Sequence, residues 1–162
     1  RSFIAANLAV VFAQQGERTL LIDADLRAQP GRGQQALFKL GKSAGLSGIL
    51  AGRAGLEVAQ LVPGLPGLAV LPAGATPPNP QELLGRPAFG DLLRIASQQF
   101  DVIIIDTPAG SDFADAEVTA ARAGAALLVA RKHQSLAPQA NQLGRRLQDS
   151  GVALVGSVLN DA

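Results

Sequence analysis

The chain has 162 residues, of which 48% are hydrophobic and 17% are charged, so we expect one globular domain rather than a disordered segment. Fourteen basic and thirteen acidic residues give a formal net charge of +1, which offers no electrostatic argument for nucleic acid as a partner. Cysteine and tyrosine are absent and there is one histidine, which excludes disulfides, thiol chemistry, a multi-histidine metal site and tyrosine phosphorylation within these residues.

No apolar run in the chain reaches the roughly 18 residues that a membrane span requires. The longest run, residues 4–13, is interrupted by Asn7 and has the pattern of a helix. Arg1 and Ser2 lead directly into this helix without a preceding strand, and the chain contains no methionine. We therefore expect residues 1–162 to be a single, partial domain whose first strand and following loop lie upstream.

Apolar runs that are typical of buried strands alternate with helical patterns along the chain. In chain order, we predict helix 2–15, strand 19–22, loops over 28–67 around a short helix 46–51, strand 68–71, helix 87–99, strand 102–105, helix 112–122, strand 125–130, helix 137–149 and strand 152–159. This alternation predicts an α/β fold in which a parallel sheet lies between helices on both of its faces. In such folds, ligands bind at the carboxyl ends of the strands.

Acidic residues follow two of the predicted strands. Asp23 and Asp25 come after strand 19–22, and Asp106 comes after strand 102–105. A carboxylate at the end of a buried strand is costly unless a cation meets it, and Mg²⁺ prefers oxygen ligands. Each aspartate alone could instead cap a helix or stabilise a turn. The two motifs together, each on an apolar strand, favour a magnesium site beside bound phosphate.

The amino terminus has the pattern of the end of a phosphate-binding loop. Ser2 could supply a hydroxyl to Mg²⁺ and Arg1 a cation to the phosphates, with the glycines of the loop lying upstream. Taken alone, this pair would be an ordinary start of a helix. A second candidate, Gly41-Lys42-Ser43, does not follow a predicted strand, so we interpret it as a surface loop.

Several stretches resemble one family. Residues 20–27 resemble the Walker A′ motif of the bacterial tyrosine kinases, and residues 102–108, with Asp106, resemble their Walker B motif. Residues 45–52 and 71–80 resemble two further stretches of that family. The similarity covers nearly the whole chain and is strongest to the EpsG-type kinases of exopolysaccharide chain-length control, which belong to the MinD/ParA group of P-loop ATPases. It implies a P-loop NTPase fold that is truncated at the amino terminus.

The resemblance also implies ATP and Mg²⁺ as cofactors and a role for each matching residue. Ser2, Asp23 and Asp106 would hold the metal, with Asp106 acting through a water molecule. Asp23, Asp25 and Asp106 would form the catalytic set, and either Asp23 or Asp25 would accept the proton of the attacking hydroxyl. Asn160, after the last predicted strand, would contact the adenine base, although a turn residue is an equally good interpretation of it.

The chain departs from the family's pattern at several points. Arg1 stands where the family usually has the Walker A lysine, and its planar guanidinium keeps the charge but not the compact shape of an ammonium group. Phosphates could still be held while phosphoryl transfer is weakened. The family's tyrosine cluster and its glycine loop are outside these residues. We therefore expect the isolated chain to bind nucleotide poorly and not to phosphorylate itself on tyrosine.

The leading hypothesis is an ATP- and Mg²⁺-dependent protein tyrosine kinase that acts in exopolysaccharide synthesis or export. The resemblance implies a cytoplasmic protein, held at the inner membrane by a membrane-spanning chain-length partner, that forms homo-oligomers and binds no nucleic acid. Two other hypotheses remain: an ATP-hydrolysing switch of the partitioning or cell-division type, and a regulator that binds nucleotide without turnover. A tyrosine cluster downstream would favour the kinase, and an amphipathic membrane-targeting helix would favour the switch.

Overall fold

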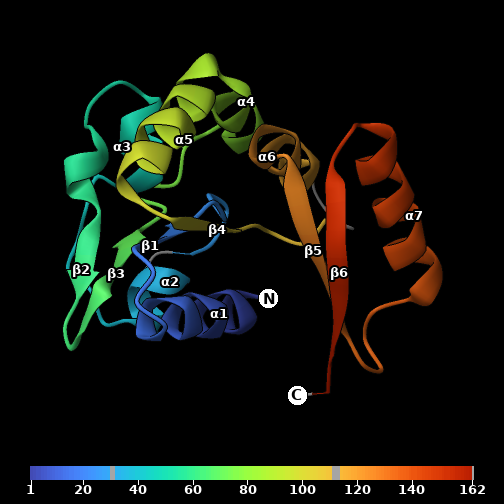
Figure 1. Ribbon diagram of the computed structural model, residues 1–162. Helices are drawn as coiled ribbons and strands as arrows, with labels where there is room; N and C mark the ends of the chain where they lie inside the picture. The colour runs from blue at the N-terminus through green and yellow to red at the C-terminus, as the bar shows by residue number, and fades with distance from the viewer. Residues whose placement is uncertain (30–31, 111–113, 162) are drawn as a thin grey trace. The chain divides into compact units, whose positions relative to one another are not determined.

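The structure, a computed structural model, describes residues 1–29, 32–110 and 114–161 (Figure 1). Contacts divide the chain into two compact units, Arg1–Pro108 and Ala109–Ala162, and each is described by itself. That all 162 residues form a single domain, with a further strand upstream, stays a prediction.

The first unit contains a four-stranded sheet with the order β2-β3-β1-β4. Its central strand β1 (Thr19–Asp23) is buried at every position and pairs in parallel with β3 (Leu65–Leu71) and β4 (Val102–Asp106). The predicted α/β fold and these three strands are confirmed. The long apolar run in β1 is explained by its position, because a central strand covered on both faces has no polar side.

The sheet is mixed, which corrects the expectation of purely parallel pairing. β2 (Gln60–Val62) lies antiparallel to β3 at the edge of the sheet, in a segment that was predicted to be loop. Three residues are too few to show a hydrophobic period. The signal in the sequence was the turn pair Pro63-Gly64, which is typical of a tight connection between two strands.

Helices cover both faces of this sheet, as predicted (Figure 1). On one face lie α1 (Ser2–Gln14) and the short α2 (Gln34–Leu37), which contact each other. On the other face lie α3 (Gly45–Leu50), α4 (Pro80–Gly85) and α5 (Pro87–Gln99), and a 3₁₀ turn spans Leu56–Val58. The sequence patterns predicted α1, α3 and α5 but not α2, which has four residues, or α4, which has six.

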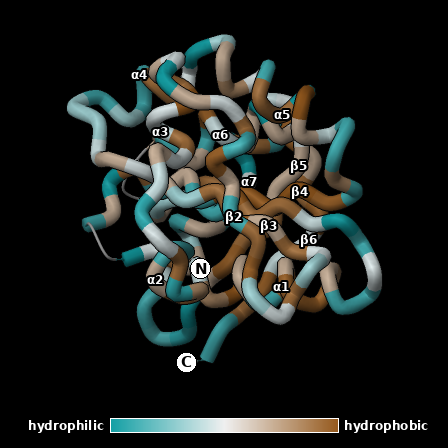
Figure 2. Tube along the Cα trace, turned by 90° about the vertical axis from the view of Figure 1, so that its left-hand side faces the viewer, coloured by the Kyte–Doolittle hydropathy of each residue, from teal (hydrophilic) through white to brown (hydrophobic). Residues whose placement is uncertain are grey.

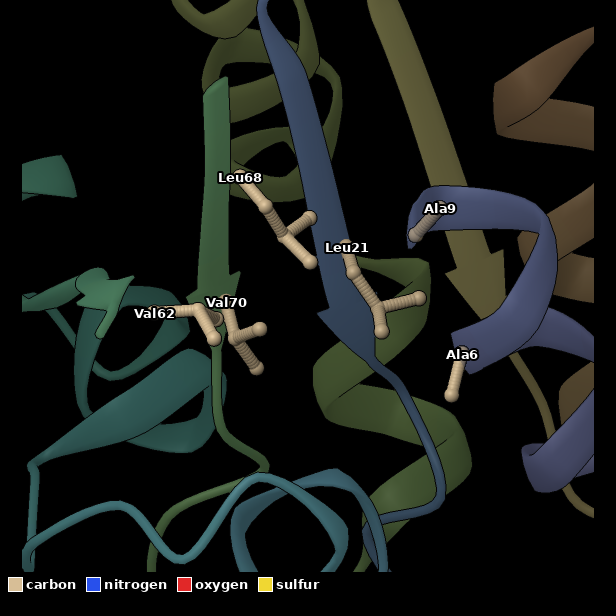
Figure 3. Packing of buried hydrophobic residues seen from close by; sticks show 6 residues of the cluster. All are labelled: Ala6, Ala9, Leu21, Val62, Leu68 and Val70. Carbon is tan, nitrogen blue, oxygen red and sulfur yellow. The ribbon is translucent and has the colours of Figure 1, made fainter. Parts of the chain in front are cut away.

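The core of the first unit forms where α1 packs against the sheet. Ala6 and Ala9 of α1 face Leu21, Leu68 and Val70, and Val62 completes the cluster (Figure 3). The small alanine side chains let the helix axis come close to the strands. Burying each leucine or valine stabilises the unit by roughly 1.5 to 3 kcal/mol. Apolar residues are concentrated in α1 and the strands, while the loops are mostly hydrophilic (Figure 2).

Two stretches that resemble the kinase family contact each other in the first unit. At the start of α3, the N–H groups of Leu46 and Ser47 donate to the carbonyls of Pro72 (2.7 Å) and Ala73 (2.9 Å). Gly74, which follows, has a φ of +83° and lies against the backbone of α3's first turn. The loop after β3 therefore caps a helix with its main chain, which requires close approach of two backbones.

The second unit is built from a parallel pair of strands and two helices. In chain order it comprises α6 (Asp115–Ala123), β5 (Ala125–Arg131), α7 (Ala137–Asp149) and β6 (Ala153–Asn160). Ala120, Leu147 and Val152 form its core. These elements match the prediction, except that the expected helix start at Asp112 lies outside the described residues. No helix in the part of the chain that the structure describes has the length and hydrophobicity of a membrane span.

In the first unit, an ion pair holds together the amino-terminal ends of β1 and β4. The Asp101 carboxylate accepts hydrogen bonds from the backbone N–H of Arg18 (2.9 Å) and from its Nε (3.0 Å) and Nη2 (2.7 Å). The N–H of Asp101 donates in return to the Arg18 carbonyl at 2.7 Å. These bonds from Arg18 lower the pKa of Asp101 from its usual value of 3.8 to about 2. The pair therefore fixes the register in which β1 and β4 begin.

Gly74→Ala should destabilise the protein strongly for two reasons. The added Cβ would overlap the Ala44 carbonyl, and the alanine backbone would have to adopt a positive φ. We expect a loss of about 3 kcal/mol or more. Gly52→Ala is the matched control: its φ is +73°, but a Cβ meets nothing within 4 Å. It should cost only about 1 to 2 kcal/mol. Denaturant unfolding measures both, and equal losses would contradict the close-approach argument.

Asp101→Asn should lower the melting temperature at neutral pH, because the charged bonds to Arg18 are lost. Since the folded-state pKa of Asp101 lies below its usual value, its contribution is present above about pH 4 and disappears as the pH falls through about 2. The difference in melting temperature between wild type and variant should therefore shrink between pH 4 and pH 2. Asp91→Asn, which removes an exposed pair with Arg94, should change little.

Candidate active site

Asp23 and Asp106 are the last residues of adjacent parallel strands. They are direct partners in the register of β1 and β4, so both carboxyl groups lie at the same edge of the sheet, as the strand-end pattern predicted. Only 1% of Asp23 and 3% of Asp106 is exposed. The Ala24 N–H donates to the Asp106 carbonyl at 2.8 Å, which keeps the two chain segments together just beyond the strands.

A buried glutamine connects these carboxylates to the first helix. Asp23 accepts hydrogen bonds from the backbone N–H groups of Asp25 (3.1 Å) and Gln34 (2.8 Å). The side-chain Nε2 of Gln34 donates to Oδ2 of Asp106 at 2.8 Å and to the carbonyl of Ser2 at 3.0 Å. The start of α1 therefore lies beside both carboxylates.

Burial dominates the electrostatics of the site. It raises the pKa of Asp23 to about 6; the hydrogen bond from the Gln34 N–H opposes the shift, and the charge of Asp106 adds to it. Burial also raises the pKa of Asp25, which is only partly buried, while the positive charge of Arg1 opposes that shift. Two adjacent buried carboxylates of this kind are a favourable place for a cation.

Arg1 lies next to the end of β4. Its Nε donates to the carbonyl of Thr107, the residue after Asp106, at 3.2 Å. The structure therefore brings the predicted residues of the first unit into one region, and these are Arg1, Ser2, Asp23, Asp25 and Asp106. Asn160 is the last residue of β6 and belongs to the second unit, where its carbonyl accepts from the Lys132 N–H at 2.8 Å. The chemical roles of all six residues stay predictions.

The donor set fits a magnesium ion that is shared with phosphate. Among the described residues, no group of three or more histidine, cysteine, aspartate or glutamate side chains is arranged to hold a metal. Mg²⁺ usually takes one or two carboxylates and fills the rest of its shell with waters and substrate phosphates. Asp23 and Asp106 match that pattern, and Ser2 lies beside them because its backbone carbonyl accepts from Gln34.

Sequence reasoning missed Gln34, which lies in a segment that was predicted to be loop. It is fully buried, and its Oε1 has no hydrogen-bond partner among the residues that the structure describes. Its partners are 11, 32 and 72 residues away, so no local pattern marks it.

The interpretation of Gly41-Lys42-Ser43 as a loop is confirmed. This segment contains no helix or strand, and its Ser43 hydroxyl donates to the Val58 carbonyl at 2.9 Å.

Comparison with known proteins places the fold and then the family. No family model matches the chain. The fold is shared with the cell division ATPase MinD of Pyrococcus furiosus (TM-score 0.79, 27% identity, 98% of this chain and 65% of that one). Together with the strand-end carboxylates, this defines an α/β domain of the P-loop ATPase class.

Closer similarity is found to tyrosine kinases. The chain is 38% identical over 161 residues to the tyrosine-protein kinase Etk of Escherichia coli K12, and it matches the solved Etk kinase domain with a TM-score of 0.89, covering 99% of this chain and 62% of that one. It also matches the VpsO kinase domain (TM-score 0.87, 31% identity, 98% of this chain and 76% of that one). The chain belongs to the bacterial tyrosine kinase family. It spans 22% of the full length of Etk.

Proposed function

We propose that the full-length protein containing this chain is an ATP- and Mg²⁺-dependent protein tyrosine kinase. Similarity to tyrosine kinases supports the kinase activity, and the buried pair Asp23 and Asp106, joined through Gln34 to the start of α1, supports the Mg²⁺-nucleotide site. Phosphoryl transfer needs positioning and charge neutralisation more than covalent chemistry by the protein. A bound Mg²⁺ would supply most of that neutralisation.

Each residue of the region has a distinct role in this proposal. Ser2, Asp23 and Asp106 would hold Mg²⁺, with Asp106 bonded to a water of its shell. Arg1 would face the phosphates. Asp25 is more exposed than Asp23, so it is better placed to take the proton of a tyrosine hydroxyl.

The second unit and the cellular setting complete the proposal. Asn160 would contact the adenine base from the end of β6. By analogy with its family, the protein would be cytoplasmic and act in exopolysaccharide synthesis or export. It would lie at the inner membrane through a membrane-spanning chain-length partner and assemble into homo-oligomers.

Two alternatives each have an observation in their favour. The 27% identity to MinD is compatible with a switch that hydrolyses ATP without transferring phosphate to protein. The guanidinium of Arg1, which is bulkier than an ammonium group, is compatible with a third possibility, a regulator that binds nucleotide without turnover. Both alternatives share the nucleotide site and differ from the kinase in what happens to the γ-phosphate.

Asp106→Asn should weaken binding of Mg-ATP to the full-length protein about tenfold or more, because a charged oxygen near Mg²⁺ is lost. Asparagine can still accept the hydrogen bond from Gln34, so the fold should persist. Calorimetric titration measures the affinity, and phosphotyrosine formation on the protein is followed in parallel. Asp91→Asn, which changes an exposed aspartate of α5, is the control and should bind as wild type does.

The same experiment separates the alternatives. Phosphotyrosine that depends on Asp106 supports the kinase. ATP consumption without phosphotyrosine would favour the switch, and binding without turnover would favour the regulator. A full-length protein that binds no Mg-ATP would contradict all three.

A further inference from the structure

We infer that Gln34 is a positioning residue of this site, which holds both carboxylates and the start of α1 in the arrangement that Mg²⁺-nucleotide requires. The inference rests on the proposed function, because it concerns the same Mg²⁺ site. It goes beyond that function by assigning a role to a side chain outside the motifs through which the chain resembles its family.

Gln34 is bonded to the three chain segments that form the site. Its backbone N–H donates to Oδ2 of Asp23 at the end of β1. Its Nε2 donates to Oδ2 of Asp106 at the end of β4 and to the carbonyl of Ser2 in α1. All three bonds are between 2.8 and 3.0 Å, and the residue is fully buried. One residue thus sets the spacing of two carboxylates and a helix.

The orientation of this amide is determined by chemistry. Both atoms that Nε2 faces, a carboxylate oxygen and a carbonyl oxygen, are acceptors. Exchanging Nε2 and Oε1 would set an acceptor against two acceptors, so the nitrogen must lie where it does. Among the residues that the structure describes, Oε1 is then left buried without a hydrogen-bond partner.

The preceding residue is adapted to the contact with Asp23. Gly33 has a φ of +78°, and a Cβ at this position would overlap the Asp23 carboxylate. The chain therefore approaches the carboxylate as closely as its backbone allows before α2 begins. The backbone conformation at Gly33 therefore places both the N–H and the side chain of Gln34 at the site.

Gln34→Met tests the role with little change in volume. Methionine fills the same space and removes Oε1, but it leaves the buried Asp106 carboxylate without this donor, so the variant should fold with a lowered melting temperature. It removes the donor to Asp106 and Ser2, which frees the carboxylate to rotate. Loss of a residue that orients a metal ligand typically lowers metal affinity by about 10- to 100-fold.

The matched control is Gln35→Met on the same helix. The Gln35 side chain donates to the carbonyl of Gly41 at 2.8 Å and does not contact the carboxylates through any bond that the structure describes. Gln34→Asn is a second variant, which keeps the amide but shortens it by one carbon, so that it cannot reach both Asp106 and Ser2. It keeps the test decisive if methionine prevents folding.

The experiment is calorimetric titration of ADP into the full-length protein, once with Mg²⁺ and once with EDTA, without any measurement of activity. In wild type, Mg²⁺ should strengthen ADP binding. In Gln34→Met, we expect ADP affinity with Mg²⁺ to fall about tenfold or more while affinity in EDTA changes by less than about twofold. Gln34→Asn should show the same selective loss, and Gln35→Met should match wild type.

Each other outcome overturns the inference. If Gln34→Met or Gln34→Asn keeps the wild-type response to Mg²⁺, Gln34 does not position the carboxylates, although the proposed function stands. If both variants lose ADP binding in EDTA as well, or neither folds, the residue serves the fold alone. If wild type binds no ADP or shows no effect of Mg²⁺, the proposed function fails first, and the inference fails with it.

Discussion

Two carboxylates buried side by side are the constraint on which the rest of the first unit depends. Asp23 and Asp106 are placed at one edge by the parallel register of β1 and β4, and the apolar strands around them exclude water. The resulting desolvation raises the pKa of Asp23 to about 6. Hydrogen bonds from backbone N–H groups and from Gln34 offset part of this cost. At the opposite end, the exposed pair Arg18–Asp101 holds the same register with full charges, since water solvates them there.

The position of α1 is tied to the same constraint. Ala6 and Ala9 are small enough to let the helix pack closely on the sheet. Its first residue, Ser2, then comes within hydrogen-bond distance of the Gln34 amide. A larger residue at either alanine position would move the helix away from the strands, and the start of α1 would leave the carboxylates. Packing in the middle of the helix therefore sets the position of its first residue.

Elements whose signal is local were predictable from the sequence. β1 and β4 are continuous apolar runs, and α5 and α7 match their expected bounds because a proline within the first turn and, for α7, Gly151 beyond the end mark their limits. The strand-end rule then predicted where Asp23 and Asp106 would meet. β2 and α2 were missed, since elements of three or four residues exist through contacts with distant segments rather than through their own pattern.

Gln34 shows why the site itself was only partly predictable. Nothing near it in sequence distinguishes it from Gln35, whose side chain bonds to a loop carbonyl. The difference arises from the turn at Gly33, which brings one glutamine against Asp23 and leaves the next outside. Gln34 binds Asp23 through its main chain and binds Asp106 and Ser2 through its side chain. A shift of any of these three residues therefore strains its bond to Gln34. Gln34 therefore links the start of α1 directly to both carboxylates.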